Sequence, residues 1–215
     1  MDGVLVDTAE FHFRAWRHTL NIYGITLTRE YFRSIFGIKN EDLLPPLLGE
    51  ASSTRLIKEI SDYKEQVFCK SIHKRVQILP GVKQWLNILE KRGVRQAVAS
   101  SAPLGNVDIL LKETGIRRYI SAVVAAGDLP GKPDPAVFLE AASLIQVPPS
   151  RCLVFEDSPA GVEAARRAGM KCIAVTTTNP ASALSSADII VDRLDHIGVE
   201  VFDELLGLKT DNLDV

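Results

Sequence analysis

The stretch Met1-Asp2-Gly3-Val4-Leu5-Val6-Asp7-Thr8 decides how the rest of the chain is interpreted. An acidic residue stands directly before a glycine, a short apolar run follows, and an Asp-Thr pair closes the stretch. This order is typical of the end of a buried strand that delivers a carboxylate to a site, because glycine permits a sharp turn beside it. Asp7 and Thr8 can then cap a following helix. The alternative is an N-terminal tail that contains Asp-Gly, a common turn signal.

Composition and charge limit the class of protein. The chain has 215 residues, 46% hydrophobic and 24% charged, which predicts one large domain, or a domain with a smaller one, around a hydrophobic core. The formal net charge of −2 gives no support to a nucleic-acid binder or a basic membrane-surface protein. No apolar stretch approaches the ~18 residues of a membrane span, and the N-terminus lacks a secretory pattern. We therefore expect a cytoplasmic monomer that binds neither nucleic acid nor membrane.

Cysteine and histidine usage argues against a disulfide framework or a zinc site. The three cysteines, Cys69, Cys152 and Cys172, are scattered and form no C-x-x-C pair. The four histidines have no ligand spacing. Free thiols in a reducing compartment are therefore expected.

Helical periodicity dominates the chain up to about residue 75. The predicted helices are Ala9–Tyr23, Thr28–Ile35, Asn40–Leu48 and Thr54–Ile72. Thr28 is expected to cap the second helix, and Pro45-Pro46 to interrupt the third. This region contains no convincing strand, which predicts a small all-helical unit.

Beyond Gly81, short apolar runs alternate with helices. The predicted strands are Val94–Ser100, Ala122–Ala126, Cys152–Phe155, Lys171–Thr176 and Asp188–Val191. The predicted helices are Val82–Arg92, Asn106–Thr114, Pro135–Ile145 and Pro159–Ala168. Such alternation is typical of a parallel sheet covered by helices on both faces.

Polar side chains stand at the ends of these predicted strands, where functional residues of parallel sheets collect. They are Asp2, Ser100, Ser101, Lys132, Glu156 and Asp157. Carboxylates suit Mg²⁺, and a lysine and a hydroxyl beside them suit the oxygens of a phosphoryl group. Each residue has an ordinary alternative: a solvated loop lysine, a turn serine, or acids at a helix N-terminus. Their common position at strand ends favours phosphoryl transfer.

Four stretches carry a resemblance to a known family. They are Asp2-Gly-Val-Leu-Val-Asp-Thr8, Val98-Ala-Ser-Ser101, Lys132-Pro-Asp-Pro135 and Phe155-Glu-Asp-Ser158. In this order they resemble the four motifs of the haloacid dehalogenase-like hydrolases, and within them the β-phosphoglucomutase-like group. The run Thr8–Trp16 is also similar to the start of the helical cap in β-phosphoglucomutases.

The resemblance implies an α/β fold: a Rossmann-like three-layer core with a parallel sheet, and an inserted all-helical cap. On this basis residues 1–8 and 76–215 are expected to form the core, and residues 9–75 the cap. The family also implies Mg²⁺, an aspartyl-phosphate intermediate and a small phosphorylated substrate.

The resemblance further implies roles for individual residues. Asp2 resembles the aspartate that serves as general acid/base and offers its backbone carbonyl to the metal. Glu156 and Asp157 resemble the acidic pair that holds the metal, and Lys132 the lysine that steadies the phosphate and the nucleophile.

Three more residues correspond to substrate contacts. Ser100 resembles the phosphate-binding hydroxyl, with Ser101 beside it. His12 matches a histidine near the substrate in the phosphoglucomutases, and a helix-surface histidine is the alternative.

The chain departs from the family pattern at its start. The nucleophilic aspartate of the family lies two residues before Asp2, a position that would precede Met1. The apolar strand that leads into it is absent too, which would leave neighbouring backbone groups unpaired at ~1–3 kcal/mol for each buried group. We therefore expect the natural protein to begin earlier. A chain that truly started at Met1 would be at most a binder of phosphate or metal.

A second departure concerns the substrate. Phosphoglucomutases carry an arginine where this chain has Asn40, and Ala102-Pro103-Leu104 replaces polar residues. These changes favour a phosphatase acting on a small phosphomonoester, such as a sugar phosphate, over a β-phosphoglucomutase. A non-catalytic protein that binds phosphorylated ligands is the third hypothesis. Four cations of the cap are either anion contacts or surface charges: Arg14, Arg17, Arg33 and Lys39.

Overall fold

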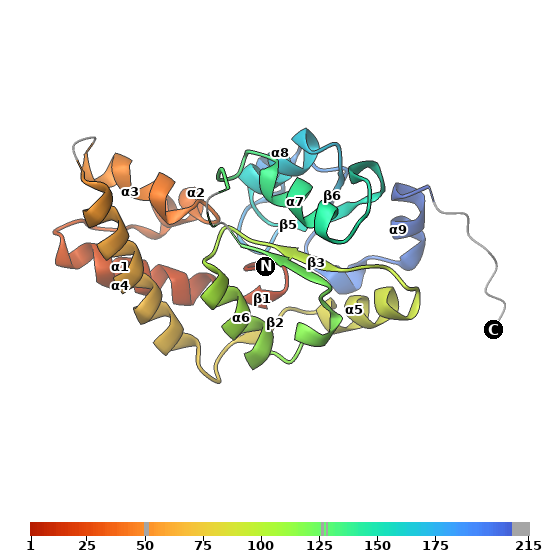
Figure 1. Cartoon of the computed structure of the whole chain (residues 1–215), viewed down its shortest axis with the longest axis horizontal. Coiled ribbons are helices and arrows are strands. Elements are labelled where there is room, and N and C mark those ends of the chain that lie inside the picture. Colours follow the sequence, from red (N-terminus) through yellow and green to blue (C-terminus); the bar gives the residue numbers. More distant parts are fainter. Residues whose placement is uncertain (50–51, 126, 128, 208–215) are drawn as a thin grey trace.

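The computed structural model describes residues 1–49, 52–125, 127 and 129–207 (Figure 1). Its helices are α1 (Ala9–Ile22), α2 (Arg29–Ile35), α3 (Asn40–Leu48), α4 (Thr54–Ile72), α5 (Val82–Lys91), α6 (Leu104–Glu113), α7 (Ala136–Leu144), α8 (Pro159–Arg167) and α9 (Val199–Leu205). Its strands are β1 (Val6–Asp7), β2 (Gln77–Ile78), β3 (Ala97–Ala99), β4 (Ala122–Val124), β5 (Leu153–Glu156), β6 (Lys171–Val175) and β7 (Ile189–Val191).

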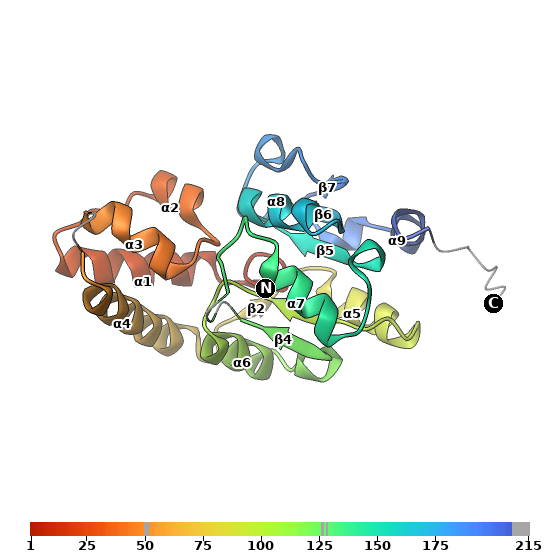
Figure 2. The ribbon, with the colours of Figure 1, turned by 45° about the horizontal axis from the view of Figure 1, so that its top comes forward.

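Helices α1–α4, which we call the helical unit, lie together at one end of the molecule (Figures 1 and 2). Phe13, Trp16 and Leu20 of α1 share one buried cluster with residues of α2, α3 and α4. Thr28 caps α2 as expected, because its hydroxyl accepts a hydrogen bond from the backbone N–H of Tyr31 at 3.2 Å. The helical unit thus has its own apolar core.

The expected interruption of the third helix is wrong. Helix α3 runs unbroken through Pro45 and Pro46. Proline removes two intrahelical donors, whose partners four residues earlier would be the carbonyls of Glu41 and Asp42. Both of these residues are exposed, so water can satisfy their carbonyls.

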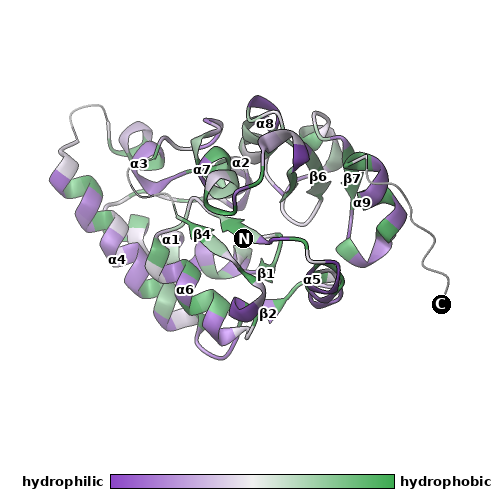
Figure 3. Ribbon diagram, turned by 45° about the vertical axis from the view of Figure 1, so that its right-hand side comes forward, coloured by the Kyte–Doolittle hydropathy of each residue, from purple (hydrophilic) through white to green (hydrophobic). Residues whose placement is uncertain are grey.

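Strands β3 to β7 form parallel pairs, as the alternation of strands and helices predicted. β3 pairs with β4, with Val98 opposite Val123. β5 pairs with β6, and β6 with β7, to give a three-stranded sheet in the order β5-β6-β7. These strands are predominantly apolar (Figure 3), as strands covered on both faces must be.

Helices cover the strands on two faces. One buried cluster joins Trp85 of α5, Leu111 of α6 and Phe202 of α9 to Ile173 of β6. A second cluster joins Val137 of α7 and Ala164 of α8 to Ala174, the next residue of β6. Since successive strand residues point to opposite faces, the core has three layers, which confirms the predicted fold class.

The N-terminal stretch differs from the expected strand end. Asp2 makes an isolated bridge to Val6, and the chain turns through Gly3, whose φ is +67°. The strand β1 follows this turn and pairs antiparallel with β2, with Val6 opposite Ile78. β1 leads into the helical unit and β2 leads out of it, so their pairing joins the two connections between the helical unit and the sheet.

An apolar channel of about 560 Å³ lies between β3 and β5. It is lined by Ala97 and Ala99 of β3, Val154 of β5, Trp85 of α5, and Leu5 of the N-terminal turn, among others. In the described part of the chain, β3 pairs only with β4 and β5 only with β6. The sheet consequently has two parts that face each other across this channel.

Smaller differences concern element ends. Helix α9 was not predicted, because its seven residues offer only two helical turns of pattern. Ala126, the last residue of one expected strand, and residues 208–215 of the expected core lie outside the described residues.

No helix among the described residues is long and apolar enough to cross a membrane. The division into core and cap domains stays a prediction.

Candidate active site

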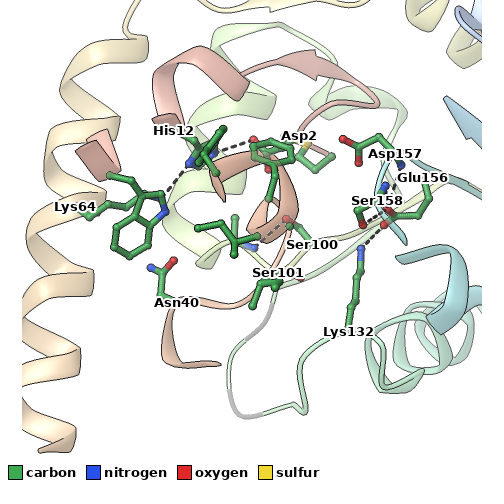
Figure 4. Close-up of a pocket in the computed structure, with 18 of the residues that line it drawn as sticks. Asp2, His12, Asn40, Lys64, Ser100, Ser101, Lys132, Glu156, Asp157 and Ser158 are labelled. Atoms are coloured by element: carbon green, nitrogen blue, oxygen red, sulfur yellow. Dashed lines mark hydrogen bonds and ion pairs between the residues drawn. The ribbon is translucent and has the colours of Figure 1, made fainter. Parts of the chain in front are cut away.

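The residues singled out from the sequence gather around one pocket between the helical unit and the strand ends (Figure 4). Asp2, Ser100, Ser101, Lys132, Glu156 and Asp157 line it, as does His12 from α1. Lys132, Glu156 and Asp157 lie at one end and Asn40 and Lys64 at the other (Figure 4). Residues spread over more than 150 positions of sequence thus share one cavity.

Asp2 is held by two neighbours. The Thr8 hydroxyl donates to Oδ1 of Asp2 at 2.6 Å, and Nε2 of His12 lies 3.2 Å from the same oxygen. Burial raises the pKa of Asp2, but the hydrogen bonds and charge around it outweigh burial and hold the pKa well below its ordinary value. Asp2 is therefore a carboxylate at neutral pH and acts as a hydrogen-bond acceptor.

His12 is buried and connects Asp2 to helix α4. Its ring stacks on Phe68 with centroids 3.9 Å apart, and Nδ1 lies 3.0 Å from Nζ of Lys64. Burial, together with the Lys64 charge, lowers the pKa of His12 below 6.5, so the ring is neutral at pH 7. The helix-surface alternative for His12 is therefore wrong.

Sequence reasoning missed Lys64. Only 3% of its side chain is exposed, and it lies four residues after Ile60 and four before Phe68, both fully buried. A lysine in the middle of an apolar helical stripe was the signal that could have identified it, since lysine is almost never buried without a partner.

Lys132 and Glu156 form a buried ion pair. Their side chains are 7% and 6% exposed, and Nζ of Lys132 donates to Oε1 of Glu156. The second oxygen of Glu156 accepts from the backbone N–H groups of Asp157 and Ser158, at 3.1 and 3.3 Å, where α8 begins. Burial raises the pKa of Glu156, but Lys132 outweighs this and lowers it overall. Both carboxylate oxygens of Glu156 are thus already hydrogen-bonded, one to Lys132 and the other to backbone N–H groups at the start of α8.

Asp157 has no cation paired with it among the described residues. Its Oδ2 accepts from the hydroxyl of Thr178 at 2.6 Å. Burial, reinforced by the negative charge of Glu156, raises the pKa of Asp157 to about 7. Gly3 packs against it so closely that a Cβ there would lie 1.9 Å from Oδ2. The glycine of the opening motif therefore makes room for this carboxylate.

The two serines follow β3. Ser100 is buried, and its hydroxyl oxygen accepts from the backbone N–H of Ala102 at 3.1 Å. That bond leaves the hydroxyl proton of Ser100 to donate to a ligand in the pocket. Ser101 is half-buried and lines the same cavity.

The four cap cations considered from the sequence do not line the pocket. Arg14 pairs with Glu10 on the surface, and Nζ of Lys39 donates to the carbonyls of Gly127 and Leu129. Arg17 and Arg33 are exposed. Surface charge is therefore the better interpretation of the three arginines, whereas the half-buried Lys39 binds two backbone carbonyls.

The chemistry of the oxygen donors fits Mg²⁺, although no three acidic, histidine or cysteine side chains among the described residues converge into a ready metal cluster. Mg²⁺ keeps several waters and takes one or two carboxylates together with substrate phosphate. Asp157 offers a carboxylate that is not paired with a cation, and no described donor is hydrogen-bonded to the backbone carbonyl oxygen of Asp2. The carboxylate of Asp2 instead binds Thr8 and His12. Direct ligation by Glu156 stays a prediction, because Lys132 holds it here.

A family model described as haloacid dehalogenase-like hydrolase matches residues 1–175. The chain therefore belongs to the haloacid dehalogenase-like hydrolases, as its motifs predicted.

Within that family, the similar proteins include phosphatases and a phosphomutase. A phosphorylated carbohydrates phosphatase from Thermotoga maritima is 31% identical over 197 residues, which are 88% of this chain and 89% of that protein. A β-phosphoglucomutase from Bacillus subtilis is 32% identical over 212 residues, 95% of this chain and 92% of the other. A chloroplastic 5-amino-6-(5-phospho-D-ribitylamino)uracil phosphatase from Arabidopsis thaliana is 32% identical over 92% of this chain, which spans only 54% of that longer protein.

The fold has close counterparts among solved structures. A β-phosphoglucomutase from Clostridium difficile superimposes with a TM-score of 0.85 at 26% identity, over 96% of this chain and 94% of the other. The chain is thus a β-phosphoglucomutase-like member of its family.

Proposed function

We propose that this protein is a Mg²⁺-dependent phosphatase that releases inorganic phosphate from small phosphorylated metabolites such as sugar phosphates. The observation that carries the proposal is the convergence of Asp2, Ser100, Lys132 and Asp157 on one pocket, at whose far end the described residues provide no unpaired cation. Relatives named as phosphatases of phosphorylated compounds support the same class of substrate.

Each residue has a proposed part in the reaction. The Ser100 hydroxyl donates to a phosphoryl oxygen, and the ammonium of Lys132 orients the phosphoryl group at the end of the pocket near Glu156. Asp2, held by Thr8 and His12, acts as general acid/base on the leaving and attacking oxygens. Mg²⁺, bound by Asp157 and the carbonyl of Asp2, would supply positive charge to the phosphoryl group. The family's aspartyl-phosphate needs the carboxylate expected two residues before Asp2.

The second candidate function is that of a β-phosphoglucomutase, which the overall likeness to the C. difficile structure favours. A mutase must hold a bisphosphate by both ends. At the far end of this pocket, Asn40 stands beside the Lys64–Glu65 pair, which favours the phosphatase. Cytoplasmic placement and a monomeric state remain part of the proposal.

Phosphate release from a panel of sugar phosphates, with and without Mg²⁺, tests the proposal. The chain is assayed as given and with an N-terminal extension that places an aspartate two residues before Asp2, and Asp2→Asn serves as the inactive control. We expect Mg²⁺-dependent release that Asp2→Asn abolishes. Isomerisation of glucose 1-phosphate without net release would favour the mutase instead. Binding without turnover in both forms would leave a phosphate-binding protein.

A further inference from the structure

The far end of the pocket contains a buried polar cluster that the phosphatase proposal does not use. Oε1 of Glu65 accepts from Nδ2 of Asn40 at 2.7 Å and from Nζ of Lys64 at 2.9 Å. Oε2 of Glu65 accepts from Nδ2 of Asn106. One carboxylate therefore joins α3, α4 and α6, and only 14% of its side chain is exposed.

Glu65 carries a negative charge into the pocket. Burial raises the pKa of Glu65, but Lys64 and Asn40 outweigh burial and lower it overall. Lys64 is ion-paired with this carboxylate, and Lys132 at the opposite end is paired with Glu156. Lys39, the residue directly before α3, donates to the carbonyls of Gly127 and Leu129.

These pairings decide which ligands can occupy the far end. Among the described residues that line the pocket, each lysine has its own carboxylate and no arginine is present. A second phosphate placed near Asn40 would meet the carboxylate of Glu65 with no unpaired cation beside it, and like charges brought together at a binding site disfavour a wrong ligand.

Hydroxyl groups meet a different environment. A carboxylate can accept about four hydrogen bonds, of which the described contacts of Glu65 use three. The amide oxygen of Asn40 accepts none from the described residues and adds a further acceptor. Trp16, Phe36 and Ile38 give this end an apolar wall. Such a surface suits a carbon skeleton that carries hydroxyls.

We infer that Glu65 is a specificity-determining residue: it selects phosphate monoesters whose far end carries hydroxyl groups and rejects esters that carry a second phosphate there. The inference rests on the proposed function, because the organic part of the substrate lies near Glu65 only when the phosphoryl group lies near Lys132. It concerns substrate choice and assigns Glu65 no part in the chemical step.

The test compares fructose 1-phosphate with fructose 1,6-bisphosphate. For the wild type we expect kcat/KM to favour the monophosphate by at least about tenfold, and Glu65→Gln to reduce this preference by about tenfold, mainly through a lower KM for the bisphosphate. Asn40→Lys, which adds a cation beside Glu65 without touching Asn106, should shift the preference in the same direction. Glu59→Gln removes an equal charge from the exposed face of α4 and should change nothing.

Binding of the same two sugar phosphates, measured by calorimetry without Mg²⁺, gives a second readout that needs no turnover. Suppose that the wild type hydrolyses the monophosphate, but that the preference for monophosphate over bisphosphate, in kcat/KM and in binding affinity, is the same in wild type and Glu65→Gln. The inference is then wrong and the phosphatase proposal stands. If neither ester is hydrolysed while Glu65→Gln still tightens bisphosphate binding, the phosphatase proposal fails and the role of Glu65 in selection stands. Failure of both sugar phosphates to bind overturns the two together.

Discussion

Nζ of Lys64 lies 3.0 Å from Nδ1 of His12, on the opposite side of the ring from Asp2. An ammonium can only donate, so Nδ1 accepts and the ring proton of neutral His12 resides on Nε2. Nε2–H then donates to Oδ1 of Asp2. A lysine of the helical unit thereby fixes the tautomer of the histidine that orients a carboxylate of the core.

Replacing Lys64 by methionine should release this constraint. Since the Lys64 charge helps to depress the pKa of His12, Lys64→Met should raise that pKa toward its ordinary value of 6.5. Nitrogen NMR of the His12 ring reports both the pKa and the tautomer without any need for turnover. Lys58→Met, on the exposed face of α4, is the matched control and should leave His12 unchanged. An identical His12 titration in both variants would contradict the assignment.

Gly3 and Gly93 provide a matched pair for testing the turn beside Asp157. Both have φ of +67°, so alanine is strained equally at either position. A Cβ at Gly3 would lie 1.9 Å from Oδ2 of Asp157, whereas a Cβ at Gly93 meets nothing within 4 Å. Gly3→Ala should therefore weaken Mg²⁺ binding at least about tenfold, while Gly93→Ala costs only the ~1 kcal/mol of backbone strain. Calorimetric titration with Mg²⁺ and thermal unfolding separate the two effects, and equal Mg²⁺ affinity in both variants would refute the role of Gly3.

The raised pKa of Asp157 predicts a pH-dependent affinity for Mg²⁺. Below its pKa of about 7, Asp157 binds a proton that the metal must displace. Mg²⁺ binding should therefore weaken roughly tenfold for each pH unit below 7 and level off above it. Calorimetry at pH 6, 7 and 8 measures this, with Asp157→Asn as the variant that should remove the dependence. An affinity that stays flat across this range would show that Asp157 does not titrate with the metal.

The raised pKa of Asp157 also affects the free energy of unfolding. This free energy should fall as the pH rises, whereas the affinity for Mg²⁺ should increase. The folded state binds the Asp157 proton more tightly than the unfolded chain, whose ordinary value is 3.8. Without metal, this contribution is fully present below pH 3.8 and is lost as the pH rises toward 7. Excess Mg²⁺ should reverse the trend, because it stabilises the deprotonated form.

The Lys132–Glu156 pair should be costly to break from one side only. Lys132→Met leaves Glu156 buried without its cation, at a cost of about 3–5 kcal/mol in the free energy of unfolding. The double variant Lys132→Met, Glu156→Gln removes both charges and should regain much of that stability but no phosphatase activity. Lys171→Met breaks a surface pair with Asp188 and should cost at most about 1 kcal/mol. Urea unfolding measures these three variants together with the single variant Glu156→Gln, and a double-variant loss equal to the sum of the two single losses would argue against coupling between Lys132 and Glu156.

Motif spacing predicted the fold, and it named residues that the structure brings to one pocket, whose roles stay a prediction. Ser100, Lys132 and Asp157 come after β3, β4 and β5, and parallel strands bring their carboxyl ends to one edge, whereas Asp2 precedes β1 and reaches the pocket through the turn at Gly3. That rule needs only chain order, so a single sequence suffices. The ion pair between Lys132 and Glu156 was not predicted, and the role of Glu156 as a metal ligand stays a prediction.

The far end of the pocket could not be predicted in the same way. Glu65 and Asn106 meet only because α4 packs against α6, and no local pattern encodes that contact. The pairing of β1 with β2 could not be predicted either, because two-residue strands carry no periodicity. Buried polar residues on helices, such as Lys64 and Asn106, are the features that deserve closer inspection in related sequences.

The channel between β3 and β5 leaves backbone hydrogen-bonding groups available in the middle of the sheet. The facing edges of the two strands have no strand partner among the described residues. An unpaired strand edge is a template on which another extended segment can pair. A segment that entered the channel would meet donors and acceptors on both sides, so the sheet offers a place for one further strand between its two parts.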